Sequence, residues 1–334
     1  MLRYVVRRLL LLIPILVGLS IIVFLFVHAL PGDPADALLG ERGTAEDEAQ
    51  IRRDLGLDKP LYEQYAIYVG NVLQGDLGSS VRTRRPVLDE LVDKFPATVE
   101  LALAAMVFAI LVGVPLGFLA ARRYQGVLDN TSLVVSLIGI SFPVFFLALI
   151  LKYIFAVRLG WLPSLGRIEI TRDLNTPTNF YLIDSIFFGD IDAFIDVVKH
   201  LILPAIALGT IPLAIVARIT RAAVLDVTSE DYIRTAQAKG LDPLVVNRRH
   251  ILKNAMLPVV TVIGLQTGLL LTGAVLTETI FEWDGVGRWM VQAIAFRDYS
   301  VLQSGILFFA IVIVVVNLLV DVSYALLNPR IRYR

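Results

Sequence analysis

Six long apolar stretches restrict the possible fold of this chain more than any other feature of its sequence. A helix needs about 20 mostly apolar residues to cross ~30 Å of hydrocarbon, because each residue adds ~1.5 Å. Hydrophobic residues make up 57% of the chain and charged residues only 18%, against ~25% charged residues in a typical soluble protein. We therefore predict an all-α integral membrane protein with six transmembrane helices. The predicted spans are residues 9–29, 98–121, 131–157, 201–216, 257–277 and 301–327.

Two of these spans have atypical ends. The first follows Arg3, Arg7 and Arg8, as the apolar core of a secretory signal peptide would. Its apolar core is about twice the usual ~7–15 residues, and no clear small-x-small cleavage site follows it, so we expect an uncleaved first span. The fourth span is the weakest, because Arg218 and Arg221 interrupt its cytoplasmic end.

The charges between the spans alternate in sign and predict the orientation of the chain. Segments 1–8, 122–129, 217–254 and 328–334 lie on one side of a six-span protein and together carry +10. The intervening segments, 28–97, 155–200 and 278–300, together carry −9. Because positive residues are retained in the cytoplasm, we predict a multi-pass protein with both termini in the cytoplasm.

The spans divide the chain into four parts. Residues 1–30 form a cytoplasmic segment and the first span, and residues 31–97 form an extracytoplasmic helical segment. Residues 98–327 form a five-helix core that includes an external loop at 159–200 and a cytoplasmic loop at 222–254, and a cytoplasmic tail follows at 328–334. Within the external segment, Thr44 and the acids after it predict one helix start, and two more helices are predicted at 61–73 and 87–95. We expect a small helical cap on the external face.

Composition argues against several functional classes. Lys and Arg together number 30, as do Asp and Glu, which excludes a strongly basic nucleic-acid binder. The chain has no cysteine and three histidines, so we expect no thiolate metal site, no catalytic cysteine and no bound metal. No lysine follows a glycine, which excludes a P-loop for ATP. We predict no catalytic residue and no cofactor bound by this chain.

Ionisable residues within the predicted spans are few and lie near span ends. They are Glu100, Lys152, Glu278 and Asp321. A secondary transporter or a membrane enzyme would need such groups near the bilayer midplane, so both classes are disfavoured. Neutral polar residues lie deeper, and they either line a pathway or hydrogen-bond between helices. The candidates for pathway lining are Gln266, Thr267 and Ser141.

Small residues at four-residue spacing predict close helix contacts within the membrane. Gly113 with Gly117, and Gly264 with Gly268, each place two glycines on one face of a helix. Such pairs allow two helix backbones to approach closely.

The cytoplasmic loop after the fourth span begins with a predicted short helix. Glu230 and Arg234 form an i, i+4 pair that favours a helix. Ile233, Ala236 and Gly240 share one face with little bulk, which another protein could approach closely. Gly240 suits the position just after a helix C-terminus, where a positive φ is common.

A second helix is predicted directly after this glycine. Asp242 followed by Pro243 is a typical N-cap and first-turn pair. The loop is therefore predicted to be a helix–glycine–helix hairpin. A plain basic loop would explain the charge of this segment but not its small-residue face or its two sets of capping signals.

This hairpin resembles the coupling loop of permease subunits of binding-protein-dependent ABC importers, with its Glu-Ala-Ala, glycine and late Leu-Pro. The corresponding residues here are Arg234-Thr235-Ala236, Gly240 and Leu257-Pro258. The chain departs from the general pattern in two ways: Arg234 replaces the leading Glu, and the glycine-to-proline interval of 18 residues is longer. In both respects it resembles the dipeptide/oligopeptide branch of these permeases. Other matching segments include Pro31-Gly32-Asp33-Pro34, Gly75-Asp76-Leu77-Gly78, Pro96-Ala97-Thr98-Val99-Glu100-Leu101, Thr277-Glu278-Thr279-Ile280-Phe281, Arg297-Asp298-Tyr299 and Asn328-Pro329-Arg330.

The resemblance implies the type I permease fold, a place in a bacterial inner membrane, and a role in ATP-driven uptake of di- or oligopeptides. It implies four partners besides the bilayer: a second similar permease, two cytoplasmic ATPases that bind ATP and Mg, and an extracytoplasmic peptide-binding protein. Importers of nickel, glutathione or longer peptides use similar subunits, so these cargoes are alternatives. The residues implied to contact an ATPase lie within 231–249 and are Asp231, Ile233, Arg234, Thr235, Ala236, Lys239, Gly240, Leu241, Asp242 and Pro243.

Overall fold

The computed structural model describes residues 2–29, positions 44, 46, 50, 52, 53, 56 and 58, residues 59–172 and residues 174–327. The predicted helix start at Thr44 falls largely outside these residues, and so does the tail 328–334. The described residues form helices joined by turns, with an isolated β-bridge between Ser79 and Pro86. The predicted all-helical class is therefore confirmed.

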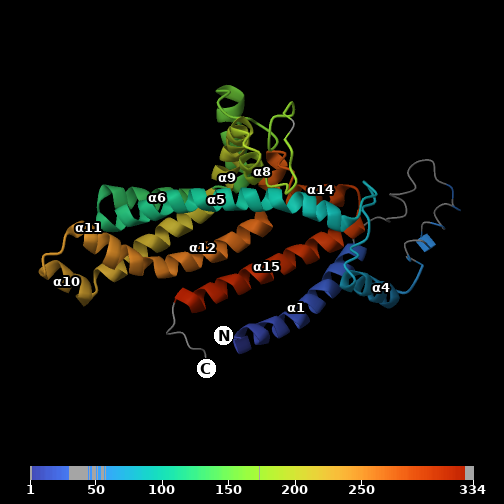
Figure 1. Ribbon diagram of the computed structural model, residues 1–334, viewed down its shortest axis with the longest axis horizontal. Helices are drawn as coiled ribbons and strands as arrows, with labels where there is room; N and C mark the ends of the chain where they lie inside the picture. Colours follow the sequence, from blue (N-terminus) through green and yellow to red (C-terminus); the bar gives the residue numbers. More distant parts are fainter. Residues whose placement is uncertain are drawn as a thin grey trace.

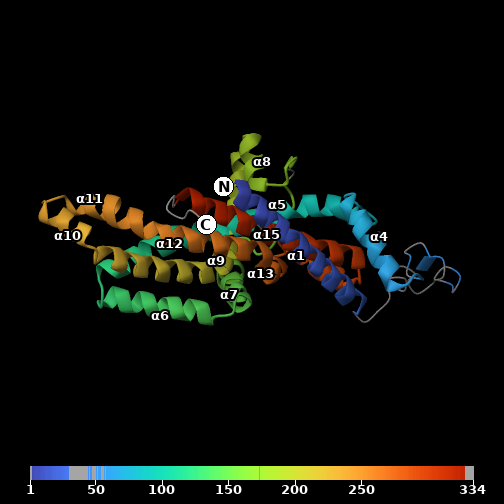
Figure 2. The same cartoon turned by 90° about the horizontal axis from the view of Figure 1, so that it is seen from below.

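The helices form an elongated bundle (Figure 1). The short helices α10 and α11 lie at one end of the long axis, α4 lies toward the other, and α8 projects from the middle (Figures 1 and 2). In chain order the elements are α1 Leu2–His28, α4 Leu61–Leu73, α5 Val87–Arg122, α6 Val127–Ser141, α7 Val144–Leu151, the π-helix η2 Lys152–Arg158, α8 Tyr181–Phe187, α9 Ile191–Thr228, α10 Asp231–Ala238, α11 Pro243–Val245, the π-helix η3 Val246–Leu252, α12 Lys253–Gly273, α13 Val275–Ile280, α14 Val286–Ala295 and α15 Tyr299–Leu327.

Several of these helices are long and apolar enough to cross a membrane. Among the described residues there are four such stretches, and a shorter apolar stretch, Ile13–His28, belongs to α1. The four are Val87–Arg122, Ile191–Thr228, Pro243–Leu271 and Tyr299–Leu318. The predicted weak fourth span is the middle of α9, whose apolar window is also the most buried of the four at 67%.

The third predicted span, 131–157, is not one continuous helix. The chain breaks between α6 and α7, where Phe142 has an extended backbone with φ −79° and ψ 125°. Pro143 follows it, and a proline disfavours helical geometry at the residue before it. The apolar stretch is therefore formed by two helices and the π-helical turn η2.

The external segment also differs in part from its prediction. The predicted helix at 61–73 is confirmed as α4. The predicted helix at 87–95 is not separate, because α5 runs from Val87 through Pro96 to Arg122 without a break. The predicted boundary between the external segment 31–97 and the core 98–327 thus falls inside a single helix.

The helices α5 and α9 form the centre of the bundle, and glycines set their separation. A Cβ atom at Gly113 of α5 would lie 2.9 Å from the carbonyl oxygen of Leu213 in α9. A Cβ at Gly209 of α9 would lie 2.6 Å from the carbonyl oxygen of Ala105 in α5. Gly117 also faces a backbone carbonyl, that of Ala217. The close approach predicted at Gly113 and Gly117 is therefore confirmed, and it brings backbone against backbone.

A buried carboxylate joins the segment after α12 to the first half of α5. Glu278 of α13 is fully buried and accepts hydrogen bonds from the Thr98 hydroxyl at 2.7 Å and the Arg288 backbone N–H at 2.9 Å. The Trp283 indole N–H donates to the Ala97 carbonyl at 2.8 Å. Two of the matching segments of the sequence, 96–101 and 277–281, thus meet at one buried junction.

Candidate functional site

The predicted hairpin is formed by α10, the turn at Gly240, α11 and the π-helical turn η3, which continues into α12. It lies at the extreme end of the long axis in both views (Figures 1 and 2). The predicted helix–glycine–helix arrangement is therefore confirmed.

Two caps shape the turn of the hairpin. Gly240 has φ +72°, its N–H donates to the Gln237 carbonyl at 2.9 Å, and the Leu241 N–H donates to the Ala236 carbonyl at 3.3 Å. This pair of bonds is a Schellman motif, which satisfies the last carbonyls of a helix. The Asp242 side chain then accepts from the Leu244 N–H at 2.6 Å, with Pro243 in the first helical turn. Local sequence alone predicted both caps.

The small-residue face of α10 points into the protein. Ile233 is fully buried and Ala236 is 6% exposed, and both belong to one apolar cluster with Val246 and Ile251 of the second arm. The same cluster includes Ala121 of α5 and residues of α9. We expected this face to be open to a partner, but an isolated helix of eight residues is unstable, and burial of its apolar side stabilises it. Ile233 and Ala236 thus join the hairpin to the ends of two long helices.

The surface that a partner could contact is the other face and the turn. Arg234 is exposed and pairs with Asp231 at 3.3 Å, an i, i+3 pair in place of the i, i+4 pair that we expected with Glu230. Leu241 is 41% exposed and Leu244 is 59% exposed, so the turn presents two apolar side chains, of which Leu244 was not among the predicted contacts. The exposed residues among the predicted contacts are Asp231, Arg234, Thr235, Lys239, Gly240, Leu241, Asp242 and Pro243.

An ion pair beside the hairpin was not predicted. Arg221, on the last turns of α9, donates through two guanidinium nitrogens to the carboxylate of Asp129 at the start of α6. Asp129 is 1% exposed and also accepts from the Gln125 N–H at 2.9 Å. The Arg221 guanidinium lies 5.5 Å from the centroid of the Tyr124 ring. The pair ties the loop between α5 and α6 to the helix that carries the hairpin. The two residues lie 92 positions apart, so no local pattern indicates the contact.

We expect Asp129→Asn to destabilise this end of the protein by about 1–3 kcal/mol, because the partly buried Arg221 guanidinium loses its charged acceptor. Hydrogen bonding to Arg221 holds the pKa of the Asp129 carboxyl below its ordinary value, although burial opposes the shift. The pair therefore stabilises the fold above the ordinary pKa of ~3.9, and this stabilisation is lost as the pH falls through the lowered pKa. Hydrogen exchange of residues 121–130 should rise in the variant. Unchanged exchange in the variant at pH 7 would contradict this role.

The candidate pathway residues lie on two different helices. Ser141 is exposed at the end of α6, next to the break at Pro143. Gln266 and Thr267 are half-buried on α12. The Thr267 hydroxyl donates to the Ile263 carbonyl of its own helix at 2.8 Å. The helices α6 and α12 both pack against α9, so all three residues lie on elements beside the central helix.

Comparisons with known proteins agree with this geometry. Residues 113–333 match the family model described as "Binding-protein-dependent transport system inner membrane component", and residues 1–102 match the model of its N-terminal part. The chain is 50% identical to a di/tripeptide transport system permease protein, DppB, of Pseudomonas aeruginosa, and both chains are covered completely. It is 49% identical to the dipeptide permease DppB of Escherichia coli K12 and 44% identical to the glutathione permease GsiC of Escherichia coli O6:H1, again with complete coverage of both chains.

A solved structure shows the same fold. A chain of the MetNI methionine ABC transporter, in an inward-facing conformation, matches 72% of this chain and 97% of its own length, with a TM-score of 0.53 and 17% sequence identity. The family models together cover most of the sequence, and the hairpin lies within the larger match. This chain therefore belongs to the family of binding-protein-dependent transport system inner membrane components.

Proposed function

We propose that this chain is one of two permease subunits of an ATP-driven importer of dipeptides and short oligopeptides in a bacterial inner membrane. The observation that carries the proposal is the 50% identity, over the complete length of both chains, to a di/tripeptide permease. Relatedness at this level extends to the external loops and the hairpin as well as to the membrane helices.

The chain crosses the membrane six times in this proposal, with both termini in the cytoplasm. The spans are α1, α5, α6 together with α7, α9, α12 and α15. The division of charge between alternate loops, +10 on one side and −9 on the other, supports this orientation. The external face then carries α4, α8 and α14, and the cytoplasmic face carries the hairpin.

The hairpin transmits ATP-driven movement by contact. Its exposed turn at Gly240, Leu241 and Leu244 docks in a groove of a cytoplasmic ATPase, and the ATPase subunits bind ATP and Mg. The buried face at Ile233 and Ala236 then transfers the movement to α5 and α9, since all of these residues share one apolar cluster. The other partners are a second homologous permease, which completes the pathway, and an extracytoplasmic peptide-binding protein. Gln266, Thr267 and Ser141 are the proposed pathway residues.

Reconstitution of the complete importer in liposomes tests the cargo. We expect uptake of a radiolabelled dipeptide that requires both ATP and the binding protein. An importer in which the second permease subunit lacks its own hairpin serves as the transport-negative control. Binding-protein-dependent uptake of nickel, without uptake of any peptide, would contradict the proposal.

Glutathione is the second candidate cargo, because the permease GsiC is 44% identical to this chain along its full length. Competition in the same liposomes separates the two candidates. For a dipeptide importer, we expect unlabelled dipeptide to reduce uptake of the label at concentrations at which glutathione has no effect. The reverse order of competition would favour glutathione.

A further inference from the structure

The external face carries a polar cavity of about 550 Å³. It lies between the first turns of α5, the loop before α8 and the exposed side of α14, and its lining includes five cationic and three carboxylate side chains. Ligand sites commonly have volumes of ~300–1,000 Å³, so a dipeptide fits. Several lining residues come from positions that are far apart in the chain, including Lys94, Tyr181 and Arg288.

Each carboxylate of this lining already has a partner within the chain. Asp93 pairs with Arg85 at 2.8 Å, and Asp284 pairs with Lys94 at 2.8 Å. The remaining one, Glu90, accepts from the Trp289 indole N–H at 2.8 Å. Two of the cations, Arg85 and Lys94, are therefore neutralised at the rim. Arg167 and Arg288 pair with Glu100 and Glu282, at 2.9 Å and 3.6 Å, outside the lining.

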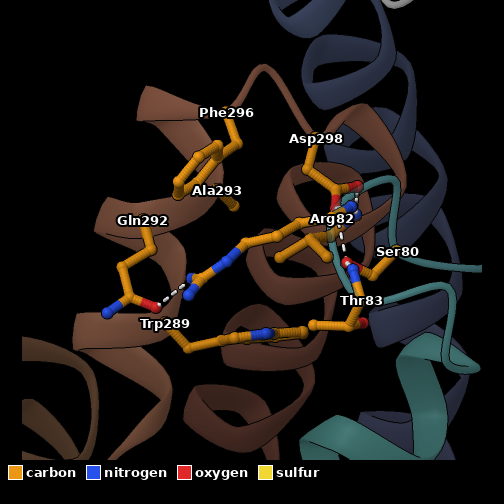
Figure 3. A pocket seen from close by; sticks show the side chains of 9 residues that line it. Ser80, Arg82, Thr83, Trp289, Gln292, Ala293, Phe296 and Asp298 are labelled. Carbon is orange, nitrogen blue, oxygen red and sulfur yellow. Dashed lines mark hydrogen bonds between the residues drawn. The ribbon is translucent and has the colours of Figure 1, made fainter. Parts of the chain in front are cut away.

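Arg82 is the exception. Its guanidinium donates to the neutral Gln292 side chain at 2.7 Å and lies 4.7 Å from the centroid of the Phe296 ring. Figure 3 shows this side chain extending from its loop toward Gln292, with Phe296 on one side and Trp289 on the other. Among the residues that the structure describes, none supplies a carboxylate within ion-pair distance of Arg82. The cavity thus contains one cation that is held in position by neutral groups and lacks a counter-charge.

The loop that carries Arg82 is itself fixed. Asp298 accepts hydrogen bonds from the Ser80 hydroxyl at 2.7 Å and from the Val81 N–H at 2.8 Å, and Figure 3 shows this anchor beside Arg82. The Ser80 N–H donates to the Arg85 carbonyl at 2.9 Å, which closes the loop. A cation on a rigid loop binds an anion with little loss of conformational entropy.

We propose that this cavity is a peptide-binding site in which Arg82 binds the terminal carboxylate of the incoming peptide. The inference rests on the proposed peptide cargo. A guanidinium binds a carboxylate through two parallel hydrogen bonds. The Asp284 side chain is 64% exposed and pairs with Lys94 through one carboxylate oxygen, and a carboxylate accepts several hydrogen bonds, so it can also accept from the peptide ammonium. The site would hold the peptide on the external face after its release from the binding protein.

The binding experiment uses the complete importer in nanodiscs, without binding protein. Saturation-transfer NMR is recorded with alanylalanine and with its C-terminal amide, which lacks the carboxylate. We expect saturable binding of alanylalanine and at least about fivefold weaker binding of the amide, because a charge-assisted bond is lost. Arg82→Gln should abolish this preference. Arg82→Lys should retain only part of it, because the lysine keeps the positive charge but cannot form the two parallel hydrogen bonds of a guanidinium. Arg84→Gln is the matched control, because Arg84 is an exposed arginine of the same loop that does not line the cavity.

Three results would overturn the inference: equal binding of the acid and the amide, an undiminished preference in Arg82→Gln, or an equal loss in Arg84→Gln. A fourth would do so as well: the wild-type importer shows no saturable peptide binding, and the binding protein binds the Arg82→Gln importer more weakly than the wild type. That result would mean that Arg82 pairs with a carboxylate of the binding protein and not with that of the peptide. Peptide uptake by the wild-type importer, measured in parallel with binding protein present, tests the cargo separately. A failure of uptake alone therefore rejects the proposed cargo, and a failure of binding alone rejects the cavity.

Discussion

Replacing Gly240 with tryptophan should uncouple the importer while leaving the subunit inserted and folded. The turn is exposed and lies outside the apolar cluster, and a Cβ at Gly240 would meet no atom within 4 Å, so the new side chain starts in open space. The positive φ of +72° adds a local strain of ~1–2 kcal/mol. We expect stimulation of ATP hydrolysis by loaded binding protein to fall at least about tenfold, equivalent to ~1.4 kcal/mol of docking free energy. The measurement is ATPase activity of the reconstituted complex.

Gly240→Asn is the matched variant for this experiment. Asparagine tolerates the left-handed backbone better than most residues, and its side chain is small, so stimulation should remain near the wild-type level. Co-purification of the ATPase subunits with each variant separates lost docking from lost insertion. Wild-type stimulation in Gly240→Trp would show that the turn does not contact the ATPase.

A second large effect is expected at the crossing of α5 and α9. In Gly117→Leu, the new Cβ would overlap the Ala217 carbonyl and lie 2.8 Å from the Thr220 Cβ. Both obstacles belong to the facing helix, and one is backbone, so rotation of a side chain cannot relieve the clash. We expect a loss of about 3 kcal/mol or more, at the upper end for overpacked cores. Thermal unfolding of the purified importer measures this loss.

Gly18→Leu in α1 is the control for this substitution. A Cβ at Gly18 would meet no atom within 4 Å, and the exchange of residue types is the same. The control should retain a melting temperature close to that of the wild type. Equal destabilisation by both substitutions would indicate a general effect of leucine in these helices and would reject the role of Gly117 in close packing.

The hairpin was predictable in its local geometry because its signals are local. Gly240, Asp242 and Pro243 act on backbone groups within a few residues of themselves, and both caps are as predicted. The direction in which α10 faces was not predictable. A face of small residues suits either a partner or the chain's own helices, and only the positions of α5, α9 and η3 decide which of them covers Ile233 and Ala236.

The membrane helices show the same limit. Hydropathy predicted most of the apolar segments, because the length of an apolar run is a property of contiguous residues. It did not predict the break at Pro143 in the third span, since an internal proline is compatible with a bent helix as well as with two helices. The continuity of α5 through Pro96 is the opposite outcome for the same residue type.

Sequence alone determined what depends on neighbouring residues: the helical class, the apolar segments, the caps of the hairpin and the glycine face of α5. Its resemblance to known permeases also pointed to the family. The tertiary structure decided every contact between distant segments, including Asp129 with Arg221, Glu278 with Thr98 and Ser80 with Asp298, which lie 92, 180 and 218 residues apart. A buried charge is stable only where the fold supplies its partner, and that partner is set by how the helices pack rather than by the residues beside it.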